Sequence, residues 1–302
     1  MARILITDPI APEGVEILKQ AGHQVDVQPE WKGDLLQEHI GAYDALIVRS
    51  ATRVTAEILQ AAKRLKVVGR AGVGLDNIDV TAARSLGIQV VNTPGATSVA
   101  VAELTIGLML ACLRRICEAH RSMQQGQWAK KALKGQELYG KTVGIVGCGR
   151  IGQEVARRLQ AFGCRVLGYD PLIHEAPFVE LVPWERLLQT VDILTLHVPL
   201  TPETRHLIRR ETLEQTRPGV ILINTSRGGV VKEDDLVEFL QKGHVACAGL
   251  DVYESEPLPP DHPLRTLPHV VLTPHIGAQT HEGQVRAAVT LAQTLVRLLA
   301  SS

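Results

Sequence analysis

The stretch Lys141 to Asp170 reads KTVGIVGCGRIGQEVARRLQAFGCRVLGYD and decides the fold of the chain. Val143 to Gly147 is a short apolar run, as in a buried parallel strand, and it leads into glycines spaced as G-x-G-x-x-G. Apolar residues then recur at helical spacing, and Arg165 to Tyr169 begins a second strand. These glycines are Gly147, Gly149 and Gly152. The stretch predicts a β-α-β unit whose helix N-terminus binds a dinucleotide diphosphate, rather than a merely glycine-rich turn.

Asp170 indicates which dinucleotide is bound. It lies at the end of the second predicted strand, eighteen residues beyond Gly152. A carboxylate there can accept hydrogen bonds from both hydroxyls of the adenosine ribose, and it repels a 2′-phosphate. We therefore predict NAD rather than NADP as the cofactor.

Composition limits the possible partners. At 302 residues the chain exceeds the usual size of a single core, which favours two domains. Lys+Arg and Asp+Glu both number 32, so no basic excess is available to bind nucleic acid or an anionic membrane. We expect neither of these partners.

The cysteines and the chain start favour a reducing compartment. The five cysteines show no C-x-x-C spacing and lie mostly in apolar runs, which predicts neither a disulfide framework nor a metal site. The start MARILITDP resembles a strand rather than a signal peptide, and the apolar segment Leu104 to Leu113 is too short to span a bilayer. The sequence predicts a soluble cytoplasmic protein.

Strands and helices alternate along both parts of the chain, which predicts an α/β fold with two Rossmann-like, doubly wound parallel sheets. The turn Asn92-Thr93-Pro94-Gly95 separates the parts, and a final helix over about 282–299 is expected to cross back to the first. We expect a discontinuous substrate domain of residues 1–92 and 276–302 and a cofactor domain of residues 93–275. We also expect one long helix from Ser98 to about Met123 and a helix at Glu203 to Glu214.

Three polar residues follow successive strands of the second part. Arg227 comes after ILINT, Glu256 after AGLDV and His275 after VVLTP. Considered one at a time, each of these residues would be interpreted as an ordinary surface, loop or helix-capping residue. Because the carboxyl ends of parallel strands lie at one edge of a sheet, we expect the three side chains to be close together.

The residue types match the oxidation of a 2-hydroxy acid by NAD. His275 has an ordinary pKa near working pH and suits the base that takes the hydroxyl proton. Glu256 can orient its ring and raise its pKa, and Arg227 offers a planar fork for a carboxylate. His197 also ends a strand, but no acid adjoins it, so we assign it to the cofactor pocket wall or to packing.

The first part of the chain offers groups that can bind the substrate. Arg70-Ala71-Gly72-Val73-Gly74 follows a strand, and its backbone N–H groups can form an anion-binding nest. Arg49-Ser50 follows the strand ALIV and can bind a second anionic group, although a solvated surface position is an equal expectation. The predicted substrate-binding residues are Arg49, Ser50, Arg70, Gly72, Val73, Gly74, Thr97 and Arg227.

With these residues in place, the sequence resembles the D-isomer-specific 2-hydroxyacid dehydrogenases over nearly its whole length. The matching motifs are VGRAGVGLDNIDV, NTPG with VAELT, VGIVGCGRIG with GYDP, INTSRGGVV, LDVYESEP and LTPHIGA. The resemblance implies that Arg227, Glu256 and His275 are catalytic, that the substrate is a small 2-hydroxy acid and that the cofactor domain forms a homodimer. Cofactor contacts are expected at Gly147, Gly149, Arg150, Ile151, Gly152, Asp170, His197, Val198, Thr225, Ser226, Arg227, Asp251, His275, Gly277 and Ala278.

The resemblance is strongest to family members that oxidise D-3-phosphoglycerate to 3-phosphohydroxypyruvate in serine biosynthesis. Arg49-Ser50 matches their phosphate-contacting pair, whereas Thr97 stands where they generally have an asparagine. Glyoxylate, hydroxypyruvate or another short 2-hydroxy acid is the alternative substrate. Formate is disfavoured because formate dehydrogenases of this superfamily have glutamine in place of Glu256.

Two further points stay open at the level of sequence. An NAD-responsive corepressor with this fold would keep the same three residues, and it would expose a hydrophobic peptide cleft on its N-terminal domain. Many family members append regulatory domains, so the chain is either the catalytic core of a longer protein, which could be a tetramer, or a short form.

Overall fold

The computed structural model describes residues 1–300, which form two compact units. The terminal unit comprises Met1–Thr97 together with the segment that starts at Ala278, and the central unit comprises Ser98–Gly277. The divisions expected from the sequence, after residues 92 and 275, lie slightly earlier in the chain. The predicted fold class, two parallel α/β sheets with one domain built from both ends of the chain, is confirmed.

The terminal unit contains a five-stranded parallel sheet of order β2-β1-β3-β4-β5. Its short strands are rich in Ile, Leu and Val and are bounded by turns, as expected for strands covered on both faces. The strands are β1 (Arg3–Ile6), β2 (Gln24–Val27), β3 (Ala45–Val48), β4 (Val67–Arg70) and β5 (Gln89–Asn92). The helices are α1 (Pro12–Gln20), α2 (Gly33–His39), α3 (Ala56–Ala61), α4 (Val80–Ser85) and α11 (His281–Ala300), with a 3-10 turn at Ile40–Ala42.

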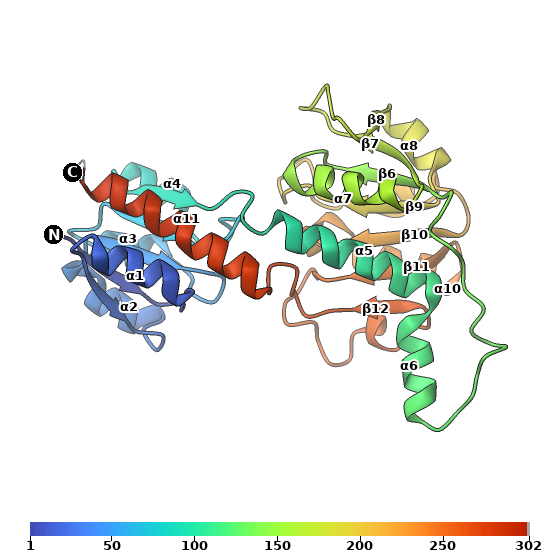
Figure 1. Ribbon diagram of the computed structural model, residues 1–302, viewed down its shortest axis with the longest axis horizontal. Coiled ribbons are helices and arrows are strands. Elements are labelled where there is room, and N and C mark those ends of the chain that lie inside the picture. The colour runs from blue at the N-terminus through green and yellow to red at the C-terminus, as the bar shows by residue number, and fades with distance from the viewer. Residues whose placement is uncertain (301–302) are drawn as a thin grey trace. The chain divides into compact units, whose positions relative to one another are not determined.

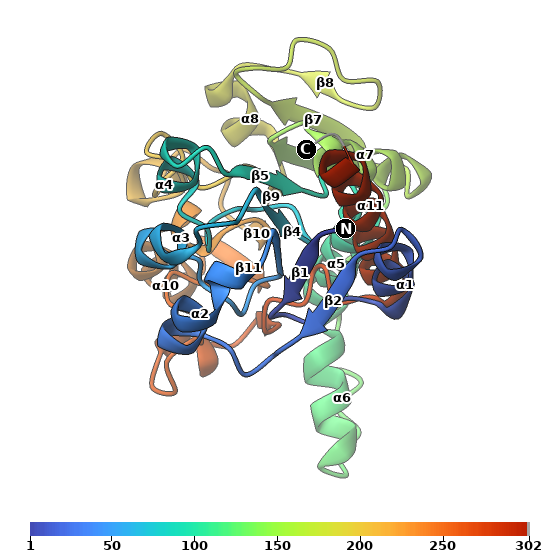
Figure 2. The same ribbon diagram turned by 90° about the vertical axis from the view of Figure 1, so that its left-hand side faces the viewer.

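Helices cover both faces of this sheet. Helices α2, α3 and α4 lie on one face, and α1 lies beside α11 on the other (Figures 1 and 2). Gly14 of α1 allows this last contact, because a Cβ there would lie 2.8 Å from the carbonyl oxygen of Ala288 in α11. The final helix is therefore an integral part of the terminal unit.

The central unit contains a seven-stranded parallel sheet of order β12-β11-β10-β9-β6-β7-β8. The sequence order reverses between β6 and β9, which is the position where ligands bind in open α/β sheets. Its strands are β6 (Thr142–Val146), β7 (Arg165–Tyr169), β8 (Glu180–Leu181), β9 (Ile193–Leu196), β10 (Val220–Asn224), β11 (Val245–Leu250) and β12 (Val270–Leu272).

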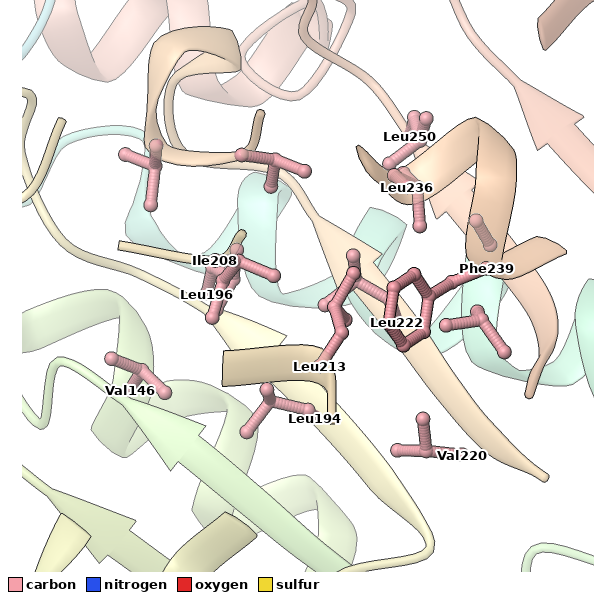
Figure 3. Close-up of a cluster of buried hydrophobic side chains, with 14 of the residues drawn as sticks. Val146, Leu194, Leu196, Ile208, Leu213, Val220, Leu222, Leu236, Phe239 and Leu250 are labelled. Atoms are coloured by element: carbon pink, nitrogen blue, oxygen red, sulfur yellow. The ribbon is translucent and has the colours of Figure 1, made fainter. Parts of the chain in front are cut away.

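Two hydrophobic clusters hold the central sheet between its helices. One contains side chains of α5, α7 and the adjoining strand faces. The other lies under α8, α9 and α10, where Leu222, Leu213 and Phe239 meet (Figure 3). The helices are α5 (Ser98–Arg114), α6 (Ile116–Gln124), α7 (Arg150–Ala161), α8 (Trp184–Thr190), α9 (Arg210–Leu213) and α10 (Glu233–Gln241), with 3-10 turns at Gly228–Val230 and Pro263–Arg265.

The single long helix expected from Ser98 to about Met123 is wrong. The chain breaks at Arg115, which has a left-handed φ of 53°, and continues as α6. The guanidinium of Arg115 donates to Glu118 Oε2 and, at 2.6 Å, to the carbonyl of Ala132. Helix α5 buries ten of its residues, whereas α6 buries none and projects from its unit (Figures 1 and 2). The break therefore coincides with the end of the buried surface.

The helix expected at Glu203 to Glu214 is also wrong, because only Arg210–Leu213 is helical. Thr204 Oγ1 donates to the carbonyl of Pro199 at 2.6 Å, and His206 has a φ of 51°. Ile208 then forms an isolated parallel bridge with Val231. Side-chain bonds to the backbone and this bridge replace the helical hydrogen bonds. The short elements β8 and α8 were not predicted.

Candidate active site

The fingerprint turn has the geometry that its glycines predict. Gly147 adopts a φ of 93° as the chain leaves β6. A Cβ on Gly152 would lie 2.2 Å from the carbonyl oxygen of Gly147, so only glycine lets α7 start this close to the strand. A Cβ on Gly149, in contrast, would have no atom within 4 Å. The helix N-terminus thus adjoins open space at the residue where a diphosphate is expected to approach the backbone.

Asp170 lies where the second fingerprint strand ends, and its carboxylate is held by backbone N–H groups. One oxygen accepts from Cys148 at 2.9 Å, and the other accepts from Leu172 and Ile173 at 2.9 and 3.2 Å. The first bond ties the end of β7 to the glycine turn. Because a carboxylate has about four acceptor positions, hydrogen-bonding capacity remains for ribose hydroxyls.

His275 and Glu256 form the hydrogen bond expected from the sequence. Nδ1 of His275 donates to Oε2 of Glu256 at 2.7 Å, which leaves Nε2 as the nitrogen that can exchange a proton with a substrate. The bond to Glu256 raises the pKa of His275 despite partial burial. Burial acts to raise the pKa of Glu256, but the bonds from His275 and from the backbone N–H of Tyr253 hold it below its ordinary value. The pair suits proton transfer near neutral pH.

Asp251 holds the loop that carries His275. This carboxylate is 1% exposed and accepts from Thr273 Oγ1 at 2.6 Å and from the N–H groups of Ile276 and Gly277, both at 2.8 Å. His275 itself has a left-handed φ of 53°, an uncommon conformation for a residue other than glycine. The resemblance assigned Asp251 a cofactor contact, and its bonds in the structure indicate a role in orienting the histidine loop.

The turn after β10 is built by Asn224, which the sequence analysis did not single out. Its Oδ1 accepts from the backbone and hydroxyl of Ser226 at 3.0 and 2.8 Å, and its Nδ2 donates to the carbonyl of Arg227 at 3.0 Å. Thr225 Oγ1 lies 2.8 Å from Thr105 Oγ1 in α5. Asn224 is 1% exposed, and its buried side chain fixes the path of the backbone at Arg227.

His197, the competing histidine, has a different environment. Its Nε2 lies 3.0 Å from Thr195 Oγ1, and its buried Nδ1 has no hydrogen-bond partner within residues 1–300. Burial lowers the pKa of His197 to about 3. A Cβ on Gly147 would lie 2.7 Å from the His197 carbonyl oxygen and 2.9 Å from Val198, so this segment adjoins the fingerprint turn. These contacts suit a pocket wall better than a base.

The terminal unit contains a small pocket of about 30 Å³ that includes predicted substrate-binding residues. Arg49, Gly72 and Thr97 contribute to its lining. Gln284 of α11 lines it too, and this residue was missed because nothing in the sequence connects the final helix with Arg49. Ser50, Arg70, Val73 and Gly74 lie outside the pocket lining.

Hydrogen bonds order the loops around this pocket. Arg70 Nε and Asn77 Nδ2 both donate to the carbonyl of Arg49, at 3.1 and 2.9 Å. The N–H of Gly72 donates to the carbonyl of Arg70 at 2.9 Å. One of the N–H groups expected in the anion-binding nest is therefore used inside the loop.

The carboxylate of Asp8 binds the backbone of the loop that carries Arg49. It accepts from the N–H groups of Arg49 and Thr52, at 2.7 and 3.0 Å, and also contacts Lys32. Burial acts to raise the pKa of Asp8, but these hydrogen bonds hold it below its ordinary value. The backbone position of Arg49 is therefore set by a buried carboxylate.

Within residues 1–300, no group of three or more His, Cys, Asp or Glu side chains is arranged to hold a metal ion. Every helix in the same range falls short of the length or the apolar character required to span a lipid bilayer.

Comparison with known proteins identifies the family. Residues 106–277 match the model of the NAD binding domain of the D-isomer specific 2-hydroxyacid dehydrogenases. The chain belongs to this family. The resemblance inferred from the motifs is confirmed, as is NAD as the cofactor predicted from the fingerprint and Asp170. The residues placed around Gly149 and Asp170 fit that cofactor.

Relatives of different activity are about equally similar to the chain. D-3-phosphoglycerate dehydrogenase of Methanocaldococcus jannaschii is 48% identical over 99% of this chain, which spans 58% of that protein. Hydroxypyruvate reductase of Thermotoga maritima is 47% identical over 98% of both chains. The crystal structure of the TT0316 protein from Thermus thermophilus has a TM-score of 0.91 and 39% identity, and the match covers 99% of this chain and 97% of that one.

Proposed function

We propose that the chain oxidises a D-2-hydroxy acid to the 2-oxo acid with NAD, and that D-3-phosphoglycerate is the preferred substrate. The observation that supports the reaction type best is the 2.7 Å hydrogen bond between His275 and Glu256 on neighbouring strand ends of the NAD-binding unit. A histidine with a raised pKa and one nitrogen left for the substrate suits a base in this reaction.

In this mechanism, Nε2 of His275 takes the hydroxyl proton while the substrate carbon loses hydride. Glu256 stabilises the imidazolium that forms, because its carboxylate stays ionised and accepts the hydrogen bond from Nδ1–H. Arg227 binds the substrate carboxylate and polarises the forming carbonyl, for which its planar guanidinium is suited. Hydride acceptance is the chemistry that NAD supplies when bound. In the reverse direction, protonated His275 returns the proton to the carbonyl oxygen.

The choice of phosphoglycerate is supported by Arg49, whose backbone Asp8 fixes and whose side chain lines a pocket of the terminal unit. A guanidinium is well suited to a phosphate. The alternative is hydroxypyruvate or glyoxylate, which is supported by the similarity to the Thermotoga maritima reductase over nearly its full length. Serine biosynthesis and a cytoplasmic location remain predictions.

A substrate panel tests the proposal. kcat/KM is measured with NAD for D-3-phosphoglycerate, D-glycerate, glycolate and D-lactate, and with NADH for the corresponding 2-oxo acids. We expect turnover with D-2-hydroxy acids and the highest kcat/KM for the phosphorylated one. A far higher value for a non-phosphorylated acid would overturn the substrate assignment. Failure of every acid would overturn the activity and favour the corepressor-like alternative.

We also propose a homodimer formed through the projecting helix α6 and the loop that follows it. Apolar side chains are exposed there: Ile116 is 51%, Met123 55% and Trp128 79% exposed. Large apolar side chains exposed on one projecting element are typical of a subunit interface. Analytical ultracentrifugation of the wild type and of the Met123→Glu, Trp128→Glu double variant tests this. A wild-type monomer, or a variant that stays dimeric, would contradict the proposal.

A further inference from the structure

Glu233 and Glu254 of the central unit bind each other's backbone. Oε1 of Glu233 accepts from the N–H of Glu254 at 2.8 Å, and Oε1 of Glu254 accepts from the N–H of Glu233 at 3.4 Å. Glu233 is the first residue of α10 and is 6% exposed. We call this arrangement the reciprocal clamp. It joins the start of α10 to the loop that follows β11.

The second oxygen of Glu233 is also engaged. Oε2 lies 3.2 Å from Nε2 of His262, whose Nδ1 accepts from the N–H of Leu264 at 3.3 Å. Since Nδ1 is an acceptor, Nε2 carries the proton and donates to Glu233. Nε2 of His206 lies 2.8 Å from Oε1 of Glu254. Asp234, the next residue in the sequence, is a further negative charge near Glu233. Glu233 is therefore fixed through both oxygens, as a buried carboxylate requires.

The clamped loop carries Glu256. Oε1 of Glu256 accepts from the N–H of Tyr253 at 3.1 Å, and its Oε2 accepts from His275. The backbone N–H groups of Tyr253 and Glu254 are thus bound by Glu256 and Glu233, respectively. A displacement of this backbone would move the carboxylate that orients the histidine.

The turn that carries Arg227 lies against the same backbone. A Cβ added to Gly228 would lie only 1.8 Å from the carbonyl carbon of Tyr253 and 2.5 Å from the nitrogen of Glu254. The two loops are therefore in direct backbone contact, with no side chain between them. Residues 253–254 therefore also restrict the position of the turn that carries Arg227.

We propose that Glu233 is a positioning residue, which sets the place of Glu256, and through it the ring of His275, by binding the backbone N–H of Glu254. Its catalytic consequence rests on the proposed function, in which His275 is the base. The positional effect itself can be measured without turnover. Nothing in the chemistry requires Glu233 to touch substrate or cofactor.

Two variants separate reach from charge at this position. Glu233→Gln loses the negative charge but keeps an oxygen at the same reach, whereas Glu233→Asp keeps the charge and shortens the side chain by about 1.5 Å. The hydrogen bond from the N–H of Glu254 is then lost in Asp but retained in Gln. In Gln the amide NH2 takes the place of Oε2, so this variant loses only the contact with Nε2 of His262. Asp234→Asn is the matched control, because Asp234 is adjacent in sequence and exposed.

The readout is the pKa of His275, followed by NMR titration of imidazole signals and assigned with a His275→Gln variant. The wild type, Glu233→Gln and Asp234→Asn are expected to keep a pKa above the ordinary value of about 6.5. Glu233→Asp is expected to fall toward that value, because Glu256 no longer holds its hydrogen bond. Its kcat/KM is expected to fall about tenfold, which corresponds to about 1.4 kcal/mol.

The outcomes are distinguishable. If His275 keeps its wild-type pKa in Glu233→Asp, the clamp is overturned. It is also overturned if the pKa of His275 falls only in Glu233→Gln, because the charge of Glu233 and not its position would then be responsible. Thermal melting of each variant shows whether it is folded. If Glu233→Asp does not fold, amide hydrogen exchange of the folded wild type decides, because the N–H of Glu254 must be protected if Glu233 binds it, and fast exchange would refute the clamp. A wild type without turnover would refute the proposed function while leaving the NMR result valid.

Discussion

The two units present strand-end loops of opposite character. In the central unit, the polar residues after β11 and β12 bind one another directly, as the bond between His275 and Glu256 illustrates. In the terminal unit, the polar residues around Arg49 bind the loop backbone, and Arg49, whose guanidinium lies 3.4 Å from Gln279 Oε1, lines a small pocket. The pairing of His275 with Glu256 and the shifts of their pKa values indicate a type of reaction. The position of Arg49 beside a pocket indicates only that a ligand bound there would be an anion.

This difference explains why the reaction type is clearer than the substrate. His275 donates to a carboxylate through Nδ1 and keeps Nε2 for a substrate, which suits proton transfer. His262 also pairs with a carboxylate, but its other nitrogen accepts from the N–H of Leu264. Arg49 is compatible with a phosphate, a carboxylate or a solvated surface position. The family comparison has the same limit, since relatives that are similar to nearly equal extents act on different acids.

Replacing His275 has the largest expected effect. His275→Ala removes the proposed base, and kcat is expected to fall about 10³-fold, within the range of general acid-base catalysis. NADH affinity, measured by fluorescence titration, should stay near that of the wild type. Unchanged kcat would show that another group acts as the base, and His197 would then be the next histidine to replace.

Replacing Arg49 tests the terminal unit in the same way. Arg49→Ala removes a charged hydrogen-bond donor, a loss of about 2 kcal/mol, so kcat/KM for D-3-phosphoglycerate should fall about thirtyfold. Rates with glycolate should change little. Arg53→Ala, on the exposed part of the same loop, is the control. Equal losses for both acids would show that Arg49 does not select a phosphate.

A smaller effect is expected at Asp170. Asp170→Asn keeps the shape of the side chain but removes the charge that disfavours a 2′-phosphate. The ratio of kcat/KM for NAD to that for NADP should fall about tenfold, since a single charge contact is changed. Steady-state kinetics with both cofactors measures this ratio. Retained discrimination would mean that the 2′-position is recognised by another group.

Much of the fold could be predicted because it depends on local patterns. Ala45–Val48 and Arg165–Tyr169 are strands with the bounds predicted. Short, largely apolar runs of this kind between turns are typical of buried strands in a parallel sheet. The break at Arg115 could not be predicted, because it is stabilised by the carbonyl of Ala132, far along the chain. Similarly, Ile208 leaves the predicted helix to pair with Val231.

The same distinction holds for the site. His275 and Glu256 meet because strand ends of one parallel sheet share an edge, which the order of strands already implies. Asp8, Asn224 and Gln284 were missed, because their importance comes from what they contact rather than from a motif. Asp8, for example, binds a backbone N–H that lies forty-one residues away in sequence. Residues that position others are visible only in three dimensions.

The pH dependence of kcat/KM in both directions of the wild-type reaction tests the central claim most directly. Oxidation requires neutral His275 and reduction requires the protonated form, whose pKa is raised by Glu256. With rising pH, oxidation should increase and reduction should decrease, about tenfold per pH unit on the limiting limb, around a shared apparent pKa above about 6.5. Both limbs should disappear in His275→Ala. Profiles that change in the same direction, or that persist in the variant, would contradict the assignment of His275 as the base.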